Sequence, residues 1–143
     1  MVGVKKSDIT YKDNVWHLNE NNNHLNKVVF DDNFKTIQID SLVLSHQNEL
    51  IQIAGVLRDT TYKNLRLSFS DVNIGNIIPE IDSLTLGGNV NGKLNFIQKR
   101  GFYYPNSNVV IDGVTINDIL FGDLSLNIDG NEDLTKYNIK STL

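Results

Sequence analysis

The chain has 143 residues and a formal net charge of −4, from 13 Lys and Arg against 17 Asp and Glu. This length suits one domain, and the acidic balance argues against nucleic acid as a partner, because phosphate binding needs clustered Lys and Arg. No apolar stretch reaches the roughly 18–20 residues of a membrane helix, and the absence of cysteine excludes disulfides, thiolate metal sites and cysteine nucleophiles.

The two ends of the sequence indicate a piece of a longer chain. Met1 to Lys6 are followed by no apolar signal segment. From Tyr137 onward the residues still alternate like a strand, with no stop signal after them. We therefore expect residues 1–143 to be a single β-rich segment of a larger protein.

The N-terminal part predicts short strands separated by polar turns. Ile9 to Tyr11, Val15 to Leu18 and Val28 to Phe30 are the strand candidates. Lys12-Asp13-Asn14 and Asp31-Asp32-Asn33 separate them from their neighbours, and such residues tolerate the positive φ of tight turns.

From residue 37 onward, apolar and polar residues alternate with a period of two, which places one apolar row on one face of a sheet. Few of these runs are apolar on both faces, so an antiparallel all-β fold is predicted. The apolar positions that we expect to share this face are Ile37, Ile39, Ile51, Ile53, Leu65, Leu67, Phe69, Leu94, Phe96, Leu124, Leu126, Ile128 and Ile139.

One segment breaks the alternation and predicts a short helix over residues 71–78. Ser70 or Asp71 can cap its start, and Pro79 stops it near Ile78. We expect this helix to lie as a lid or plug at one end of the sheet. The alternative is an irregular loop with buried isoleucines.

Further reversals are predicted at His46 to Glu49, Lys99-Arg100-Gly101, Asp112-Gly113 and Asp129-Gly130-Asn131. Gly87 to Gly92 lack the Lys-Ser/Thr ending of a phosphate loop. Their glycines indicate a tight turn and a kink in the sheet.

No catalytic constellation is present in the sequence. His17, His24 and His46 have no metal-ligand spacing and are interpreted as surface residues. Asp129, Asn131 and Asp133 form only an incomplete calcium pattern, for which a polar turn is the simpler interpretation. We predict that the protein is not an enzyme and needs no cofactor or metal.

Aromatic residues leave a binding function open. Phe102-Tyr103-Tyr104 is the densest cluster, either a sugar- or membrane-facing patch or an edge strand packed on a neighbour. A closed β-sandwich that binds sugars through Trp16 or this cluster is therefore one alternative. Another is an assembly module whose open strand edges pair with other strands.

Residues 65–97 carry a resemblance to a known family. An alternating strand, Leu65 to Phe69, is followed by the short helix ending at Pro79 and by a strand with the sequence Ser83-Leu84-Thr85-Leu86-Gly87-Gly88-Asn89-Val90-Asn91-Gly92-Lys93-Leu94-Asn95-Phe96. This arrangement resembles the repeat unit of TamB (translocation and assembly module) proteins of the AsmA-like group, in a Bacteroidetes-type form. Weaker similarity extends over residues 37–143, whereas residues 1–36 match only in being strand-like.

The resemblance implies a strongly curved β-taco or clam-like trough with a hydrophobic groove. It implies a periplasmic protein, anchored at the inner membrane, that carries phospholipid to the outer membrane and supports outer-membrane biogenesis and protein secretion. Implied partners are acyl chains, neighbouring repeats of the same chain and an outer-membrane barrel of the TamA type. The apolar positions given above would line the groove, and their filling of an ordinary closed core is the alternative.

Overall fold

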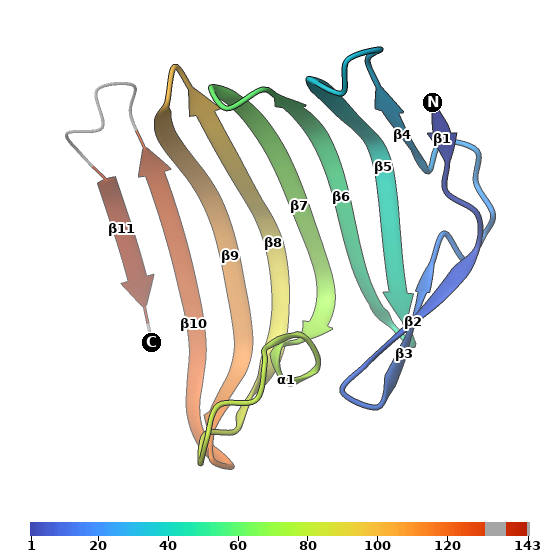
Figure 1. Ribbon diagram of the computed structural model, residues 1–143. Helices are drawn as coiled ribbons and strands as arrows, with labels where there is room; N and C mark the ends of the chain where they lie inside the picture. The colour runs from blue at the N-terminus through green and yellow to red at the C-terminus, as the bar shows by residue number, and fades with distance from the viewer. Residues whose placement is uncertain (131–136, 143) are drawn as a thin grey trace.

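The computed structural model describes residues 1–130 and 137–142, with side chains for residues 1–129. In this part of the chain, eleven strands form one open antiparallel sheet (Figure 1). The predicted all-β, antiparallel fold class is confirmed. The strands are β1 (Val2–Gly3), β2 (Ser7–Tyr11), β3 (Asn14–Leu18), β4 (Lys27–Phe30), β5 (Thr36–His46), β6 (Glu49–Arg58), β7 (Tyr62–Asn73), β8 (Leu86–Lys99), β9 (Phe102–Ile116), β10 (Ile119–Gly130) and β11 (Tyr137–Thr142).

From β4 to β11 the strands lie side by side in chain order, and β1 pairs with β4 at the N-terminal edge. The β2–β3 hairpin leaves this path, because β3 pairs with β5 only through His17 and Leu18. We call the end of the strands where this hairpin turns and the helix lies the lower end, and the opposite end the upper end (Figure 1).

Tight turns join several of these strands. Type I′ geometry, with positive φ at both central residues, occurs at Lys12-Asp13, Arg100-Gly101 and Asn117-Asp118. The prediction of a reversal at Asp112-Gly113 is wrong, because both residues lie inside β9. There the Gly113 N–H donates to the Asp123 carboxylate at 2.8 Å. An Asp-Gly pair occurs at irregularities within strands as well as in turns, which is why the sequence predicts a turn at this position. The reversal lies instead at Asn117-Asp118, between β9 and β10.

Glycines allow the strands to approach closely and the sheet to curl. Gly55 has φ +147° and Gly92 has φ +127°, and a Cβ at either position would overlap a backbone carbonyl oxygen of the neighbouring strand. The predicted tight turn at Gly87-Gly88 is wrong, since both lie within β8. The predicted kink is present as a register shift between Gly87 and Asn89.

The helix α1 (Ile74–Ile77) lies within the predicted range of 71–78. Its cap is Asn73 and not Ser70 or Asp71, because β7 continues to Asn73 before the chain turns. The Asn73 side chain accepts a hydrogen bond from the Gly75 N–H at 2.9 Å. Pro79 follows directly after the C-cap residue, Ile78, as expected for a helix stop.

The buried apolar core of the described residues is small and lies at the lower end. It consists of Trp16, Val72, Val90 and Val109. Partly buried side chains from the sheet and from α1 pack against it, including Phe69, Ile74 and Ile77. No second sheet is found among the described strands, so the sandwich alternative is wrong.

Candidate functional site: an open apolar sheet face

The strand register places the predicted lining residues on one face of the sheet, which we call the inner face. Ile53 lies opposite Leu67, and Leu67 lies opposite Leu94. Directly opposed residues of an antiparallel pair point to the same side. Followed from strand to strand, this relation includes Ile37, Ile39, Ile51, Leu65, Phe69, Phe96, Leu124, Leu126 and Ile128. Ile139 lies opposite Ile128, but its side chain is outside the described residues.

These side chains are not sealed in a core. Each of them that the structure describes is half-buried, except Phe96, which is 38% exposed. They shield one another across the strands, while no second layer of the described chain covers the middle of the face. The inner face is therefore apolar and partly open to solvent.

The total surface agrees with an uncovered sheet. The chain exposes 9555 Å². Size scaling for compact proteins of this mass gives about 7,400 Å². The excess of roughly 2,100 Å² is large for one domain, because a closed globule of this length would bury such a face. An open sheet leaves it exposed.

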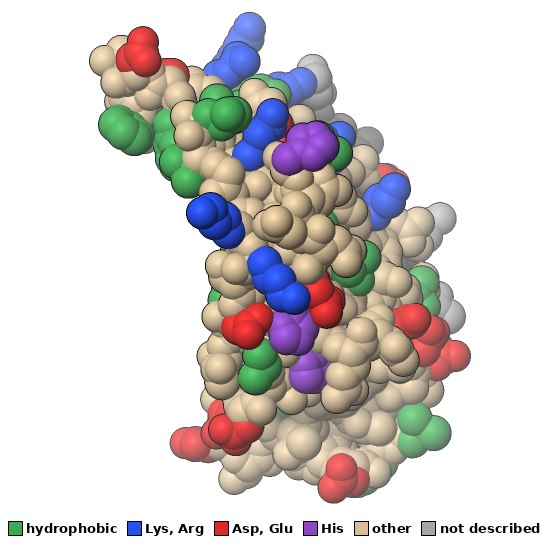
Figure 2. All heavy atoms as spheres, turned by 90° about the vertical axis from the view of Figure 1, so that its right-hand side faces the viewer, with side chains coloured by type: hydrophobic (Ala, Val, Ile, Leu, Met, Phe, Trp, Pro, Cys, Tyr) green, Lys and Arg blue, Asp and Glu red, His purple; other side chains and the backbone are tan. Residues whose placement is uncertain are grey.

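The inner face is the concave one. Ser107 lies in the middle of the sheet between Leu94 and Ile128 and is only 5% exposed. Its neighbours in the strand, Asn106 and Asn108, point to the opposite, outer face and are exposed. In the side view of Figure 2 the outline is hollowed on the left, the side that faces the reader in Figure 1.

The outer face is mostly polar. Gln52, Ser68, Lys93 and Asn108 lie opposite one another in turn across β6 to β9 on this side. All of them are exposed except Ser68, which is half-buried. This contrast between the two faces is the structural consequence of the period-two pattern.

At the lower end, α1 and the β2–β3 hairpin cover the inner face. Trp16 of β3 is 5% exposed and belongs to the core cluster with Val72. Lys12, in the hairpin turn, donates to the carbonyl oxygens of Gly75 and Ile78 at 2.9 and 3.0 Å. A lysine in this position satisfies helix carbonyls that have no partner within the helix. The hairpin and α1 therefore form one cap.

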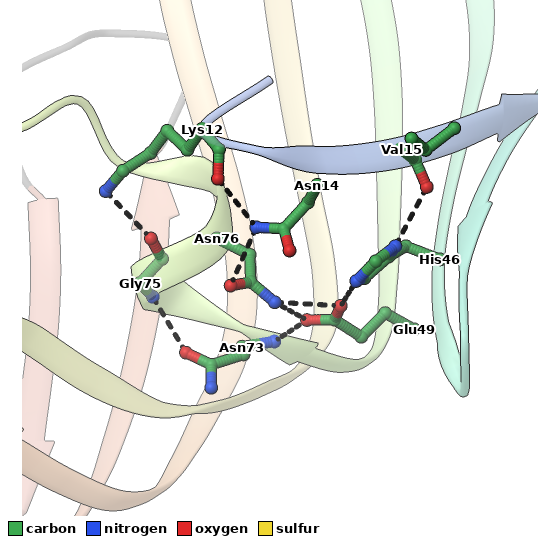
Figure 3. Close-up of polar contacts among 8 residues, drawn as sticks. All are labelled: Lys12, Asn14, Val15, His46, Glu49, Asn73, Gly75 and Asn76. Atoms are coloured by element: carbon green, nitrogen blue, oxygen red, sulfur yellow. Dashed lines mark hydrogen bonds and ion pairs between the residues drawn. The ribbon is translucent and has the colours of Figure 1, made fainter. Parts of the chain in front are cut away.

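A buried carboxylate joins this cap to the sheet (Figure 3). Glu49, at the start of β6, is 8% exposed. Its carboxylate accepts hydrogen bonds from the Asn73 backbone N–H at 2.5 Å and from the Asn76 side-chain amide at 3.0 Å. A charged acceptor with several donors is among the stronger polar contacts in a protein. Glu49 thus fixes both the end of β7 and the position of α1.

His46 takes part in the same lower-end cluster, so its prediction as a surface residue is wrong. Its side chain is 13% exposed, and Nε2 lies 3.8 Å from Glu49. Its ring centroid is 5.3 Å from that of Trp16. Nothing in the sequence indicated this, because His46 to Glu49 have the composition of an ordinary polar turn. The proposed sugar-binding role of Trp16 is also excluded by its burial.

The upper end carries a polar row on the inner face. Lys63, Gln98 and Tyr103 lie directly opposite one another on β7, β8 and β9. Gln98 is 5% exposed, and its buried Oε1 accepts no hydrogen bond from the described residues. Lys63 is half-buried and takes part in none of the ion pairs of the described chain. The sequence does not single out Lys63 and Gln98, since period-two alternation does not reveal which polar residue interrupts an apolar row.

Phe102-Tyr103-Tyr104 are divided between the two faces. Tyr103 lies on the inner face, where its ring centroid is 5.2 Å from that of Phe96. Phe102 and Tyr104, one residue before and after, lie on the outer face. The described register of β9 with β10 begins only at Asn106. The cluster therefore does not form one continuous aromatic patch.

Charge differs between the two ends. The upper-end turns carry both signs of charge, with the bases Lys35, Arg58, Lys99 and Arg100 beside the acids Asp31, Asp32 and Asp59. The lower-end turns carry mostly acids, such as Asp13, Glu80, Asp82 and Asp118. In Figure 2, Lys and Arg gather in the upper half and Asp and Glu dominate the lower end. The upper end is therefore of mixed charge, and the capped lower end is mainly acidic.

Acidic residues also occur in the upper part of the sheet, where hydrogen bonds keep them ionised. The backbone N–H of Thr36 lowers the pKa of Asp31. The Thr61 hydroxyl donates to Asp59 at 2.7 Å and lowers the pKa of that carboxyl. The Gln38 side-chain amide, followed by Lys27, lowers the pKa of Asp40. These three carboxylates are therefore hydrogen-bonded mainly to residues close to them in the sequence.

Other features of the described residues do not form a chemical site. A cavity of about 360 Å³ beside α1 is lined by Lys12, Gly75 and residues 78–86, none of them a predicted lining residue. No group of His, Asp and Glu in the described part could hold a metal ion. Asn131 and Asp133, of the incomplete calcium pattern, lie outside it. No described helix is long and apolar enough to cross a membrane.

Comparison with protein-family models, with curated proteins and with solved structures found no match to this chain. The functional interpretation therefore depends on the geometry of the inner face and on the resemblance carried by residues 65–97.

Proposed function

We propose that the inner face binds the acyl chains of phospholipids, and that this chain is a non-enzymatic, lipid-carrying section of a larger protein. The observation that carries the proposal is the gathering of the predicted lining residues on one concave face that no second layer of the described chain covers. A soluble protein rarely leaves such a surface without a ligand or a partner.

The energetics favour this ligand. Each CH₂ group that moves from water to an apolar surface contributes about 0.8 kcal/mol. A face of Ile, Leu and Phe can therefore hold an acyl chain without specific polar contacts to the chain itself. The polar outer face keeps the assembly in water, as the alternation of the strands requires.

The resemblance to TamB proteins supplies the biological setting of the proposal. In that setting the section belongs to a periplasmic bridge that is anchored at the inner membrane and carries phospholipid to the outer membrane. Neighbouring repeats would extend the groove beyond β11, and a TamA-type barrel would be the outer-membrane partner.

The test is to purify the protein from cells without detergent and to measure bound lipid by native mass spectrometry. We expect co-purified phospholipid with the native chain. Leu126→Arg, which places a charge on the inner face, should lower the bound lipid at least tenfold. Ser125→Arg is the matched control, because Ser125 lies next to Leu126 on the same strand and points to the outer face.

Circular dichroism and thermal unfolding would establish that both variants are folded. Equal lipid content in the two folded variants would contradict a lipid-binding inner face. Lipid-free native protein would contradict the proposed function as a whole.

A second candidate function is assembly through the sheet edges. In the described chain, β11 pairs with β10 alone, so its other edge presents backbone N–H and C=O groups. Such an edge can accept a strand of another chain. Lipid-free protein that self-associates, and becomes monomeric with Asn138→Pro, would favour this alternative.

A further inference from the structure

The polar row at the upper end interrupts an otherwise apolar face. Lys63, Gln98 and Tyr103 form one row across β7, β8 and β9, and Leu65 and Phe96 form the next row toward the lower end. The boundary between charge and hydrocarbon therefore falls between adjacent rows. A phospholipid has the same boundary between its headgroup and its acyl chains.

Two groups of this row, the Lys63 ammonium and the Gln98 Oε1, have no partner among the described residues. Lys63 is half-buried, and no carboxylate of the described residues lies within ion-pair distance of it. Gln98 is nine-tenths buried, and its Oε1 accepts no hydrogen bond from the part of the chain that the structure describes. Buried polar atoms in folded proteins nearly always have a partner, so an unsatisfied one indicates a missing donor. A ligand with an anionic group for Lys63 and a hydroxyl group for Gln98 would satisfy both.

The distance to the cap suits an acyl chain. From Lys63 to Phe69, where the core cluster begins, β7 extends for six residues, or about 20 Å. One leaflet of a bilayer contributes about 15 Å of hydrocarbon thickness. A lipid whose headgroup lies at Lys63 would thus reach the cap region with its chain ends.

We propose that the inner face binds an anionic, glycerol-bearing phospholipid in one orientation, with the phosphate at Lys63, a headgroup hydroxyl donating to Gln98, and the acyl chains directed toward Trp16. This inference rests on the proposed function and adds the headgroup class and the polarity of binding. The acidic residues of the lower-end turns, such as Asp13, Glu80 and Asp118, oppose the reverse orientation by long-range repulsion of an anionic headgroup.

The first test measures headgroup preference. The protein is incubated with small vesicles of phosphatidylglycerol and phosphatidylcholine in equal amounts, recovered by flotation, and its bound lipid is identified by mass spectrometry. We expect enrichment of phosphatidylglycerol in the native chain. Lys63→Gln should reduce this enrichment about tenfold, the effect of losing one charge-assisted contact.

Arg66→Gln is the matched control, because Arg66 lies on the same strand but is exposed on the outer face. It should leave the enrichment unchanged. Gln98→Leu should reduce the enrichment, because it removes the acceptor for the headgroup hydroxyl. It should keep the fold, because it also removes a buried oxygen that has no hydrogen-bond donor among the described residues. Vesicles that also contain oleate distinguish the source of the anion, since preferential uptake of the free carboxylate would overturn the phospholipid assignment.

The second test measures orientation. Trp16 is the single tryptophan of the chain and lies in the cap. Phosphatidylglycerol brominated near the terminal methyl group should quench its fluorescence more strongly than lipid brominated near the carbonyl. The reverse order would overturn the proposed polarity.

The outcomes separate the two proposals. If Lys63→Gln and Arg66→Gln behave alike while Leu126→Arg still loses lipid, this inference fails and the lipid-binding face remains. If the native chain takes up neither lipid, the proposed function itself fails.

Discussion

The lower and upper ends of the sheet are stabilised in different ways. At the lower end, Trp16, Val72, Val90 and Val109 form a buried core that α1 and the β2–β3 hairpin cover. At the upper end the same inner face continues with Leu65, which is half-buried, and Phe96, which is 38% exposed. The upper end is held by strand pairing and tight turns, and no second layer of the described residues covers it.

This difference indicates where binding can take place without unfolding the protein. Regions with few buried apolar contacts have low local stability and are where ligand-binding elements are usually found. The capped end supplies tertiary packing, and the open end keeps an apolar surface available. Four comparisons between the ends follow, from the largest expected effect to the smallest.

The largest difference is expected for aromatic truncations. Trp16→Ala removes a buried ring of the cap and should lower the free energy of unfolding by about 3–5 kcal/mol. Phe96→Ala, at the open end, removes a side chain that is 38% exposed and should cost about 1 kcal/mol. Urea unfolding followed by circular dichroism measures both, and equal losses would contradict the distinction between the ends.

Close backbone packing at glycine should contribute to stability even in the upper half of the sheet, away from the buried core. Gly55 lies in the upper half of β6, with φ +147° and a carbonyl oxygen in the place of a Cβ. Gly55→Ala should therefore lower stability by about 3 kcal/mol, through overlap and backbone strain. Gly3→Ala is the control, since a Cβ there meets nothing within 4 Å. A neutral Gly55→Ala would show that tight curling does not stabilise the upper end.

The carboxylate that holds the cap should have an intermediate effect. Glu49→Ala leaves the Asn73 N–H and the Asn76 amide without their acceptor and should cost about 2 kcal/mol. Hydrogen exchange should accelerate at α1 more than at the turns of the upper end. Glu80→Ala, an exposed acid of the lower end, should change neither quantity.

Acid should have the smallest effect, concentrated in the upper part of the sheet. Hydrogen bonds lower the folded-state pKa of Asp31, Asp40 and Asp59 below the ordinary value of 3.8. Their contribution is therefore complete above pH 3.8 and is lost as the pH falls through the lowered values. Asp31→Asn combined with Asp59→Asn should flatten the acid limb of the stability curve. An unchanged limb would contradict this.

Much of the sheet could be predicted from local patterns, because alternation and turn chemistry act over a few residues. The period-two runs of residues 51–57 and 65–69 were enough to place Ile53 and Leu67 on one face. The short helix followed from the break in alternation and from Pro79. Turns that share their chemistry with strand irregularities, such as Asp112-Gly113, could not be located, because the pairing register decides between the two.

The sequence by itself determined the class of structure and the chemical difference between the faces, since both depend on the order of apolar and polar residues along each strand. Only the tertiary structure decided that Glu49 is buried and His46 largely shielded. The same holds for the place of Trp16 in a cap and for the interruption of the apolar face by Lys63 and Gln98. Those features depend on contacts between residues far apart in the chain. No local pattern encodes them, because each is made by the register of separate strands and by the folding of the hairpin over the sheet.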